Sequence, residues 1–279
     1  VEDSSEPLLL PEVIINDITG IVNAVNYNVG MNKFLLQGAP GTGKTEAVKQ
    51  IARLLDRELY MVDFSSLIDS KLGQTQKNIS TMFQEINNLR HPDKVVVLFD
   101  EIDALVLDRT NSNDLRKMGR ATSTFLKGLD RLNKEVVLIA TTNLYKYFDK
   151  ALSRRFDAII NFDRYTHEDL MEVAEGLLEN YLKKFKITYK NIRLFRKIMN
   201  LYEQIPYPGE LKNIIKTSIT FCNLEDHTDY MRRLYASVCN NNHPQLKALH
   251  DQGYTVREME VLTTLSKSNI ARRLKENIL

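Results

Sequence analysis

The sequence has little cysteine and no long apolar run, and each shortage excludes a class of protein. The two cysteines among 279 residues, Cys222 and Cys239, are too few for a disulfide framework and lack the spacing of a zinc site. No apolar run approaches the roughly 20 residues of a membrane span. Leu8–Leu10 is also too short for the core of a signal peptide. We therefore expect a cytoplasmic protein with no membrane partner.

An excess of charge of either sign is also missing. The chain has 38 Lys and Arg against 36 Asp and Glu, a net charge of +2. This balance gives no global argument for binding to nucleic acid or membrane, so any basic patch must be local. The length allows one substantial α/β domain and a smaller second domain.

Short apolar runs alternate with longer amphipathic stretches in the first part of the chain. They predict strands at Lys33–Leu36, Glu58–Val62, Val95–Phe99, Val136–Ala140 and Ala158–Phe162. The third and fourth runs are almost continuous in Val, Leu and Ile, which is typical of parallel strands covered by helices on both faces. We expect an α/β domain with a five-stranded parallel sheet over residues 31–164, after a lead-in segment and helix over residues 1–30.

From Tyr165 onward only helical patterns remain. They predict helices at Thr166–Phe185, Asn191–Gln204, Gly209–Asn223 and Asp229–Asn240. Thr166 and Asp169 have the spacing of a capping box at the start of the first helix. We expect an all-α domain over residues 165–226 and a C-terminal helical extension over residues 227–279.

A glycine-rich segment separates the first predicted strand from a helical pattern. It consists of Gly38, Ala39, Pro40, Gly41, Thr42, Gly43, Lys44 and Thr45. Glycines let a backbone curl with its N–H groups inward, and the positive end of the following helix faces the same space. The spacing G-x-x-x-x-G-K-T predicts a loop that binds a nucleoside triphosphate, whereas the alternative is an ordinary glycine turn. In such a loop Lys44 contacts the β- and γ-phosphates and Thr45 ligates Mg²⁺.

Polar residues follow two of the predicted strands. Asp100 and Glu101 end the third run, at the sheet edge where ligands of open α/β sheets bind. We expect Asp100 to hold the magnesium shell and Glu101 to orient and deprotonate the attacking water. Asn143 follows the fourth run, where its neutral amide can hold the water or the γ-phosphate, although asparagine is also a common turn residue.

Two adjacent arginines, Arg154 and Arg155, precede the fifth predicted strand. Arginines in such a place are often solvated charge. They are also the residues with which a neighbouring subunit stabilises charge on a transferred phosphoryl group, an effect worth roughly 10³–10⁵ in rate.

In this order the motifs resemble those of AAA-type ATPases of the AAA+ superfamily, over Pro11 to Asn223. The resemblance implies a P-loop NTPase sheet with a helical lid over residues 165–226, ATP and Mg²⁺ as cofactors, and a homo-oligomeric ring. The ring is typically a hexamer in which each site is completed by the next subunit. The implied roles are Walker A for Lys44 and Thr45, Walker B for Asp100 and Glu101, sensor 1 for Asn143, and paired arginine fingers for Arg154 and Arg155.

Two segments match the family less closely. Ser66–Thr75 resembles the first pore loop, but Leu72 stands where threading members carry an aromatic residue. Leucine offers an extended polypeptide less contact area than an aromatic ring does. The sequence therefore does not decide whether a polypeptide is threaded through the pore. Pro208–Lys212 resembles the start of the helix that carries sensor 2, and Lys212 is a candidate contact of the γ-phosphate.

The tail, residues 244–279, has the pattern of three short helices. Gly253–Glu276 resembles the helix-turn-helix of bacterial DNA-binding proteins, although Glu260 and Thr264 replace the usual small residue and glycine. Ser266 would cap a recognition helix that exposes Lys267, Ser268, Asn269, Arg272 and Arg273. The alternative is a helical extension that packs on the lid or on a partner.

These features predict a magnesium-dependent ATPase whose cycle moves lid against core and remodels or regulates a protein partner. The alternative is a DNA-associated ATPase of the mobile-element or defence type, which uses residues 244–279. A third reading is a nucleotide-gated switch that threads nothing, which Leu72 leaves open.

Overall fold

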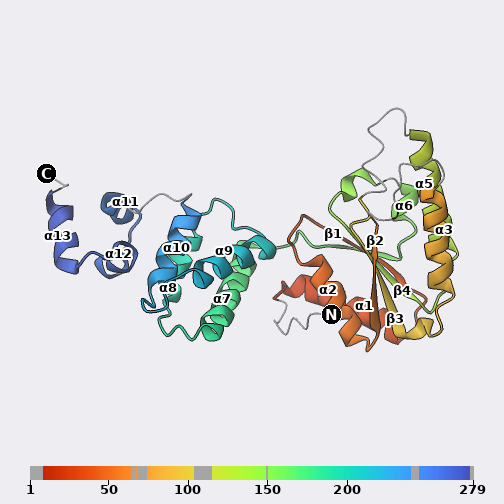
Figure 1. Cartoon of the computed structure of the whole chain (residues 1–279), viewed down its shortest axis with the longest axis horizontal. Coiled ribbons are helices and arrows are strands. Elements are labelled where there is room, and N and C mark those ends of the chain that lie inside the picture. The colour runs from red at the N-terminus through yellow and green to blue at the C-terminus, as the bar shows by residue number, and fades with distance from the viewer. Residues whose placement is uncertain are drawn as a thin grey trace. The chain divides into compact units, whose positions relative to one another are not determined.

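The computed structural model describes residues 9–64, 67, 74–103, 115–148, 150–239 and 245–276 (Figure 1). The chain divides into two compact units, Val1–Arg164 and Tyr165–Leu279. Leu72 and most of the segment predicted to resemble a pore loop lie outside the described residues. Among the helices within those ranges, none is both long enough and apolar enough to cross a membrane.

The first unit is built on a five-stranded parallel sheet with the strand order β2-β3-β4-β1-β5. The strands are β1 (Lys33–Gln37), β2 (Glu58–Asp63), β3 (Val95–Asp100), β4 (Val137–Thr142) and β5 (Ala158–Asn161). No boundary differs from its prediction by more than two residues. The predicted α/β sheet is therefore confirmed. The apolar runs of β3 and β4 are buried almost throughout, as expected for strands covered on both faces.

Helices cover both faces of this sheet (Figure 1). The described helical elements of the unit are α1 (Glu12–Asn26), α2 (Lys44–Leu54), α3 (Gln74–Asn87), η2 (Pro92–Lys94), α5 (Leu115–Asp130), η4 (Tyr145–Tyr147) and α6 (Lys150–Ser153). Helices α1 and α2 lie on one face, and α3 and α5 lie on the other (Figure 1). Beneath α3 and α5, the rings of Phe64, Phe83, Phe99 and Phe125 pack together with centroids 5.3 to 5.8 Å apart. This cluster anchors β3, whose carboxyl end carries Asp100.

Every described element of the second unit is a helix. They are α7 (His167–Lys184), α8 (Ile192–Met199), α9 (Pro208–Thr220), α10 (Asp229–Val238), α11 (Leu246–Asp251), α12 (Val256–Thr263) and α13 (Lys267–Glu276). The capping box predicted at Thr166 and Asp169 is present at the start of α7. Helix α8 ends at Met199, five residues before the predicted end. Asn200 follows it, a poor helix former whose side chain lies 2.9 Å from the His167 ring.

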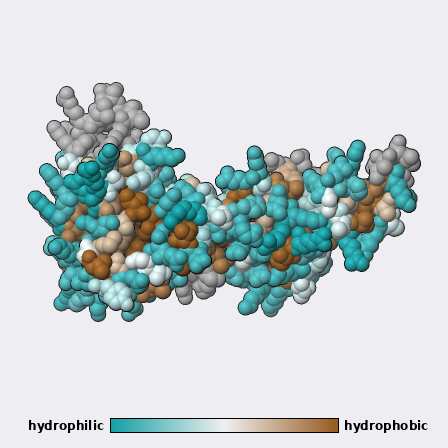
Figure 2. All heavy atoms as spheres, turned by 180° about the vertical axis from the view of Figure 1, so that it is seen from behind, coloured by the Kyte–Doolittle hydropathy of each residue, from teal (hydrophilic) through white to brown (hydrophobic). Residues whose placement is uncertain are grey.

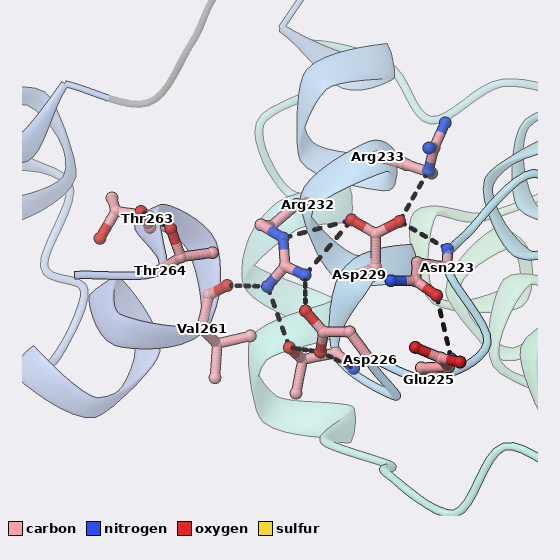
Figure 3. A network of polar contacts seen from close by, with 10 residues as sticks. Asn223, Glu225, Asp226, Asp229, Arg232, Arg233, Val261, Thr263 and Thr264 are labelled. Atoms are coloured by element: carbon pink, nitrogen blue, oxygen red, sulfur yellow. Dashed lines mark hydrogen bonds and ion pairs between the residues drawn. The ribbon is translucent and has the colours of Figure 1, made fainter. Parts of the chain in front are cut away.

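The tail helices pack on the preceding helices through α12. Arg232 of α10 makes one polar link, because it donates to the carbonyl oxygen of Val261 on α12 at 2.9 Å (Figure 3). Its guanidinium also pairs with Asp226 and Asp229, which hold it in place. Its side chain is only 18% exposed, so this link is partly shielded from water.

A second link joins α8 to the tail. Lys197 donates to the carboxylate of Glu258 at 2.7 Å and to the carbonyl oxygen of Gly253 at 2.9 Å. The side chain of Glu258 is 6% exposed, and this burial raises the pKa of its carboxyl. The contacts with Lys197 and Thr255 together outweigh burial, so the pKa is lowered overall. Edge-to-face packing of Tyr235 on Tyr254 adds an apolar contact. The tail is thus part of the helical unit.

Candidate active site

The glycine-rich loop connects the end of β1 to the start of α2. The φ angles of three glycines in this loop are positive, a backbone conformation that other residues rarely adopt. They are 154° for Gly38, 78° for Gly41 and 95° for Gly43. A Cβ atom on Gly38 would also lie 3.0 Å from the Cβ of Phe162. The strand, loop and helix therefore follow one another as a phosphate-binding loop requires.

Lys44 is the first residue of α2, and it is buried with only 7% exposure. Its ammonium donates to the carbonyl oxygens of Gly38 and Ala39 at 2.7 and 2.9 Å, and to Oδ1 of Asn143 at 2.8 Å. Burial lowers the pKa of this ammonium. The opposing effect comes from the carboxylates of Asp163, Asp103, Asp100 and Glu101. The lysine is thus held inside the loop, where anionic phosphates would replace its carbonyl partners.

Asp100 lies at the carboxyl end of β3 and faces the start of α2. The hydroxyl of Thr45 donates to its two carboxylate oxygens at 3.2 and 3.3 Å. The hydroxyl of Thr141, on β4, donates to Oδ1 at 2.6 Å. A hydroxyl beside one carboxylate fits Mg²⁺, which takes oxygen ligands and is often held by one or two carboxylates together with substrate phosphates. Thr45 and Asp100 are therefore the residues that would hold the metal.

Glu101 has the unusual φ angle of +51°. For a residue other than glycine this conformation costs on the order of 1–3 kcal/mol and is typical of functional sites. The amide of Glu101 donates to the hydroxyl of Thr141 at 2.9 Å, which helps to hold the turn. The exposed carboxylate accepts from Nδ2 of Asn143 at 3.4 Å.

Asn143 therefore links the phosphate loop to the carboxylate pair after β3. Its amide oxygen contacts Lys44, and its amide nitrogen contacts Glu101. The structure brings all three side chains to the carboxyl edge of the sheet. Their catalytic roles stay predictions.

Several residues at this edge were missed by the sequence reasoning. Asp163 accepts from the amide of Ala39 at 2.6 Å and so fixes the phosphate loop from the end of β5. Thr141 contacts Asp100 and the Glu101 amide, and Asp103 contacts the chain around Asn143. A carboxylate two residues after Glu101 was a visible signal for Asp103. No comparable local signal marks Asp163.

The two adjacent arginines differ in their surroundings. Arg155 pairs with Asp130 at 3.2 Å and donates to the carbonyl oxygen of Ala151 at 2.8 Å. Arg154 is exposed, and within the described residues its side chain makes no hydrogen bond or ion pair. Lys212 is exposed on α9 of the second unit, and its contact with a nucleotide stays a prediction.

Comparison with known proteins agrees with this geometry. The profile of the family described as "ATPase family associated with various cellular activities (AAA)" matches residues 34–164. "Uncharacterized AAA family ATPase y4kL" of Sinorhizobium fredii is 36% identical over 133 residues, which are 48% of this chain and 39% of that protein. "Cell division protein C" of Sulfolobus acidocaldarius is 30% identical over 191 residues, which are 66% of this chain and 48% of that protein. The chain thus spans less than half the length of these relatives.

The fold is shared with a solved structure, "Structure of E. coli MS115-1 HORMA:CdnC:Trip13 complex". The TM-score is 0.64 at 20% identity, with 85% of this chain and 90% of that chain covered. At this identity the likeness concerns the fold. Together with the family match, the phosphate loop and the carboxylates of Asp100 and Glu101 show that residues 34–164 form a domain of the AAA family of ATPases.

Proposed function

We propose that the chain hydrolyses ATP with Mg²⁺ in a homo-oligomeric ring, and that the cycle remodels or regulates a protein partner. The observation that supports hydrolysis most directly is the chain of contacts from Lys44 through Asn143 to Glu101, with separations of 2.8 and 3.4 Å. It joins a phosphate-binding cation, a neutral amide and a carboxylate base at one sheet edge. These are the groups that phosphoryl transfer to water requires.

Each residue has a separate task in this mechanism. Lys44 and the loop amides hold the β- and γ-phosphates of ATP. Thr45 and Asp100 would hold a Mg²⁺ ion, which would supply positive charge beside these phosphates. Asn143 orients the attacking water and Glu101 accepts its proton, while the water oxygen bonds to the γ-phosphorus. The bond from that phosphorus to the bridging oxygen breaks, which yields ADP and inorganic phosphate.

Exposed apolar side chains support self-association of the first unit. Among the described residues, most of the large apolar side chains that remain exposed belong to this unit. Figure 2 shows apolar surface, coloured brown, on one face of the molecule. They include Tyr27, Val29, Tyr147, and Tyr60 and Met61 on the edge strand β2. In the proposed ring a second copy of the chain would cover part of this apolar surface and would bring Arg154 to a neighbouring nucleotide.

We expect Lys44→Ala to weaken nucleotide binding by about 10- to 100-fold, because it removes a buried cation that makes charge-assisted hydrogen bonds to the phosphates. Fluorescence titration with a labelled ATP analogue measures the affinity. Lys49→Ala is the matched control, since Lys49 lies on the same helix and pairs with the nearby Glu46 at the surface. Equal affinity of Lys44→Ala and Lys49→Ala would contradict the phosphate site.

A specific observation on α13 favours a second function, binding to duplex DNA. This helix buries Ile270 and exposes Ser268, Arg272 and Lys275 on its outer side. Thr264 adopts the left-handed conformation (φ 61°) in the short turn between α12 and α13. We propose that the exposed basic side of α13 contacts DNA phosphates.

The double variant Arg272→Ala/Lys275→Ala should bind duplex DNA more weakly than the unaltered chain. The slope of log K against log salt concentration should become shallower by about 1 for each lost phosphate contact. Fluorescence anisotropy with labelled duplex DNA over a salt series measures both quantities. Lys216→Ala, an exposed lysine on α9, is the control. No binding by the unaltered chain at low salt, or an unchanged slope in the double variant, would exclude this function.

A further inference from the structure

Asp103 is a buried carboxylate beside the candidate active site that the mechanism above does not use. It is 7% exposed and lies in the turn that follows β3. The hydroxyl of Thr142 donates to its Oδ1. The amide of Asn143 donates to Oδ2 at 3.0 Å, and the amide of Leu144 donates to Oδ1 at 3.3 Å. All of these described donors are neutral, and all of them belong to one short segment.

The donors show what the carboxylate holds. Residues 142–144 form the end of β4 and the turn from which the Asn143 side chain projects. Hydrogen bonds to an ionised acceptor are stronger than those between neutral groups. Thr142 is also tied to the phosphate loop, because its carbonyl oxygen accepts from the amide of Gly38 at 3.2 Å. The main chain on both sides of Asn143 is therefore fixed, and the direction of its side chain is fixed with it.

Fold stability alone does not account for a charge at this place. Burial of a carboxylate is costly, and replacement of buried polar partners by well-packed apolar groups is often neutral or stabilising. The carboxylate does, however, set the position of a side chain that contacts Lys44 and Glu101 at the same time. A small shift of such a group can reduce a reaction rate by roughly 10²-fold.

We propose that Asp103 is a positioning residue for ATP hydrolysis, which holds residues 142–144 so that Asn143 lies between Lys44 and Glu101. The inference rests on the proposed ATPase function. Asp103 acts through Asn143 and contacts neither the phosphates nor the attacking water in this scheme.

Asp103→Asn is the direct test, because asparagine keeps the volume but turns an NH₂ group toward main-chain N–H donors. We expect kcat to fall on the order of 10- to 100-fold, as for other residues that orient a contacting group. The affinity for a labelled ATP analogue should change by less than about threefold, since the interaction serves the reacting geometry. Hydrogen exchange at the amides of Asn143 and Leu144, measured without nucleotide, should become faster.

The partner hydroxyl offers an independent variant with a conservative rescue. Thr142→Val keeps the shape of the buried side chain and removes the hydroxyl that donates to Asp103. Thr142→Ser keeps that hydroxyl. We expect Thr142→Val to reduce kcat and Thr142→Ser to retain most of it. If Thr142 mattered only through the packing of its methyl group, the serine variant would instead be the less active of the two.

Asp93→Asn is the matched control, because Asp93 is exposed and lies at the opposite, amino end of β3. The inference is overturned if the unaltered chain hydrolyses ATP and Asp103→Asn hydrolyses it equally fast. It is also overturned if exchange at residues 143 and 144 is unchanged. If the unaltered chain shows no turnover but exchange at these amides rises in Asp103→Asn, the ATPase proposal fails while the positioning contact stands.

Discussion

Glu101→Gln should bind ATP with unchanged affinity and hydrolyse it about 10²–10⁴ times more slowly, the range that general base catalysis contributes. Glutamine has the size of glutamate and keeps an oxygen for the Nδ2 group of Asn143, which lies 3.4 Å from the carboxylate. It cannot accept the proton of the attacking water. Phosphate release at saturating ATP measures turnover, and titration with a labelled ATP analogue measures affinity.

A matched control separates the loss of a base from the loss of a charge. Glu46→Gln removes a carboxylate from the first turn of α2, where Glu46 pairs with Lys49 at the surface. We expect this variant to retain normal turnover. Near-normal turnover of Glu101→Gln would show that another group activates the water, and the left-handed turn at Glu101 would then need another explanation.

The fold was predictable in outline because its strands have strong local signals. The apolar runs at β3 and β4 are long, rich in β-branched residues and bounded by polar segments, so they identify buried parallel strands. The strand order was not predictable from these signals. Placement of β1 between β4 and β5 depends on contacts among residues far apart in the chain, which no local pattern encodes.

The candidate site was predictable where function depends on spacing in the chain. The loop from Gly38 to Thr45 and the pair Asp100-Glu101 are short segments whose residue order carries the chemistry. Contacts that bring distant residues together were not visible. Asp163 reaches Ala39 across 124 positions, and Thr141 reaches Asp100 across 41, so only the folded sheet makes them neighbours.

The arginine pair shows the same limit in another form. The motif predicts the same role, that of an arginine finger, for Arg154 and Arg155. In the structure, however, Arg155 forms an ion pair with Asp130 at the end of α5. The ion pair between Arg155 and Asp130 is partly exposed. A surface ion pair of this kind stabilises a fold by only about 0–1 kcal/mol. The further hydrogen bond from Arg155 to the Ala151 carbonyl oxygen also directs its side chain back onto its own subunit. We therefore expect Arg154 to be the finger that depends most on a neighbour.

Arg154→Ala should reduce ATP turnover by about 10³-fold or more and leave nucleotide affinity largely intact, because the arginine stabilises charge only during phosphoryl transfer. Arg155→Ala should also lose activity, but less of it. Asp130→Asn is the control for the ion pair, since it removes the charge that pairs with Arg155 and leaves Arg154 unchanged. We expect this variant to retain turnover.

Mixing variants tests whether the arginine acts across subunits. In a ring that contains both Arg154→Ala and Lys44→Ala chains, some sites combine an intact Lys44 from one chain with an intact Arg154 from the next. Such a mixture should therefore recover part of the turnover that neither variant shows alone. If no mixing ratio restores activity while both proteins still assemble, catalysis does not cross a subunit boundary. The exposed Arg154 would then be a solvated surface charge.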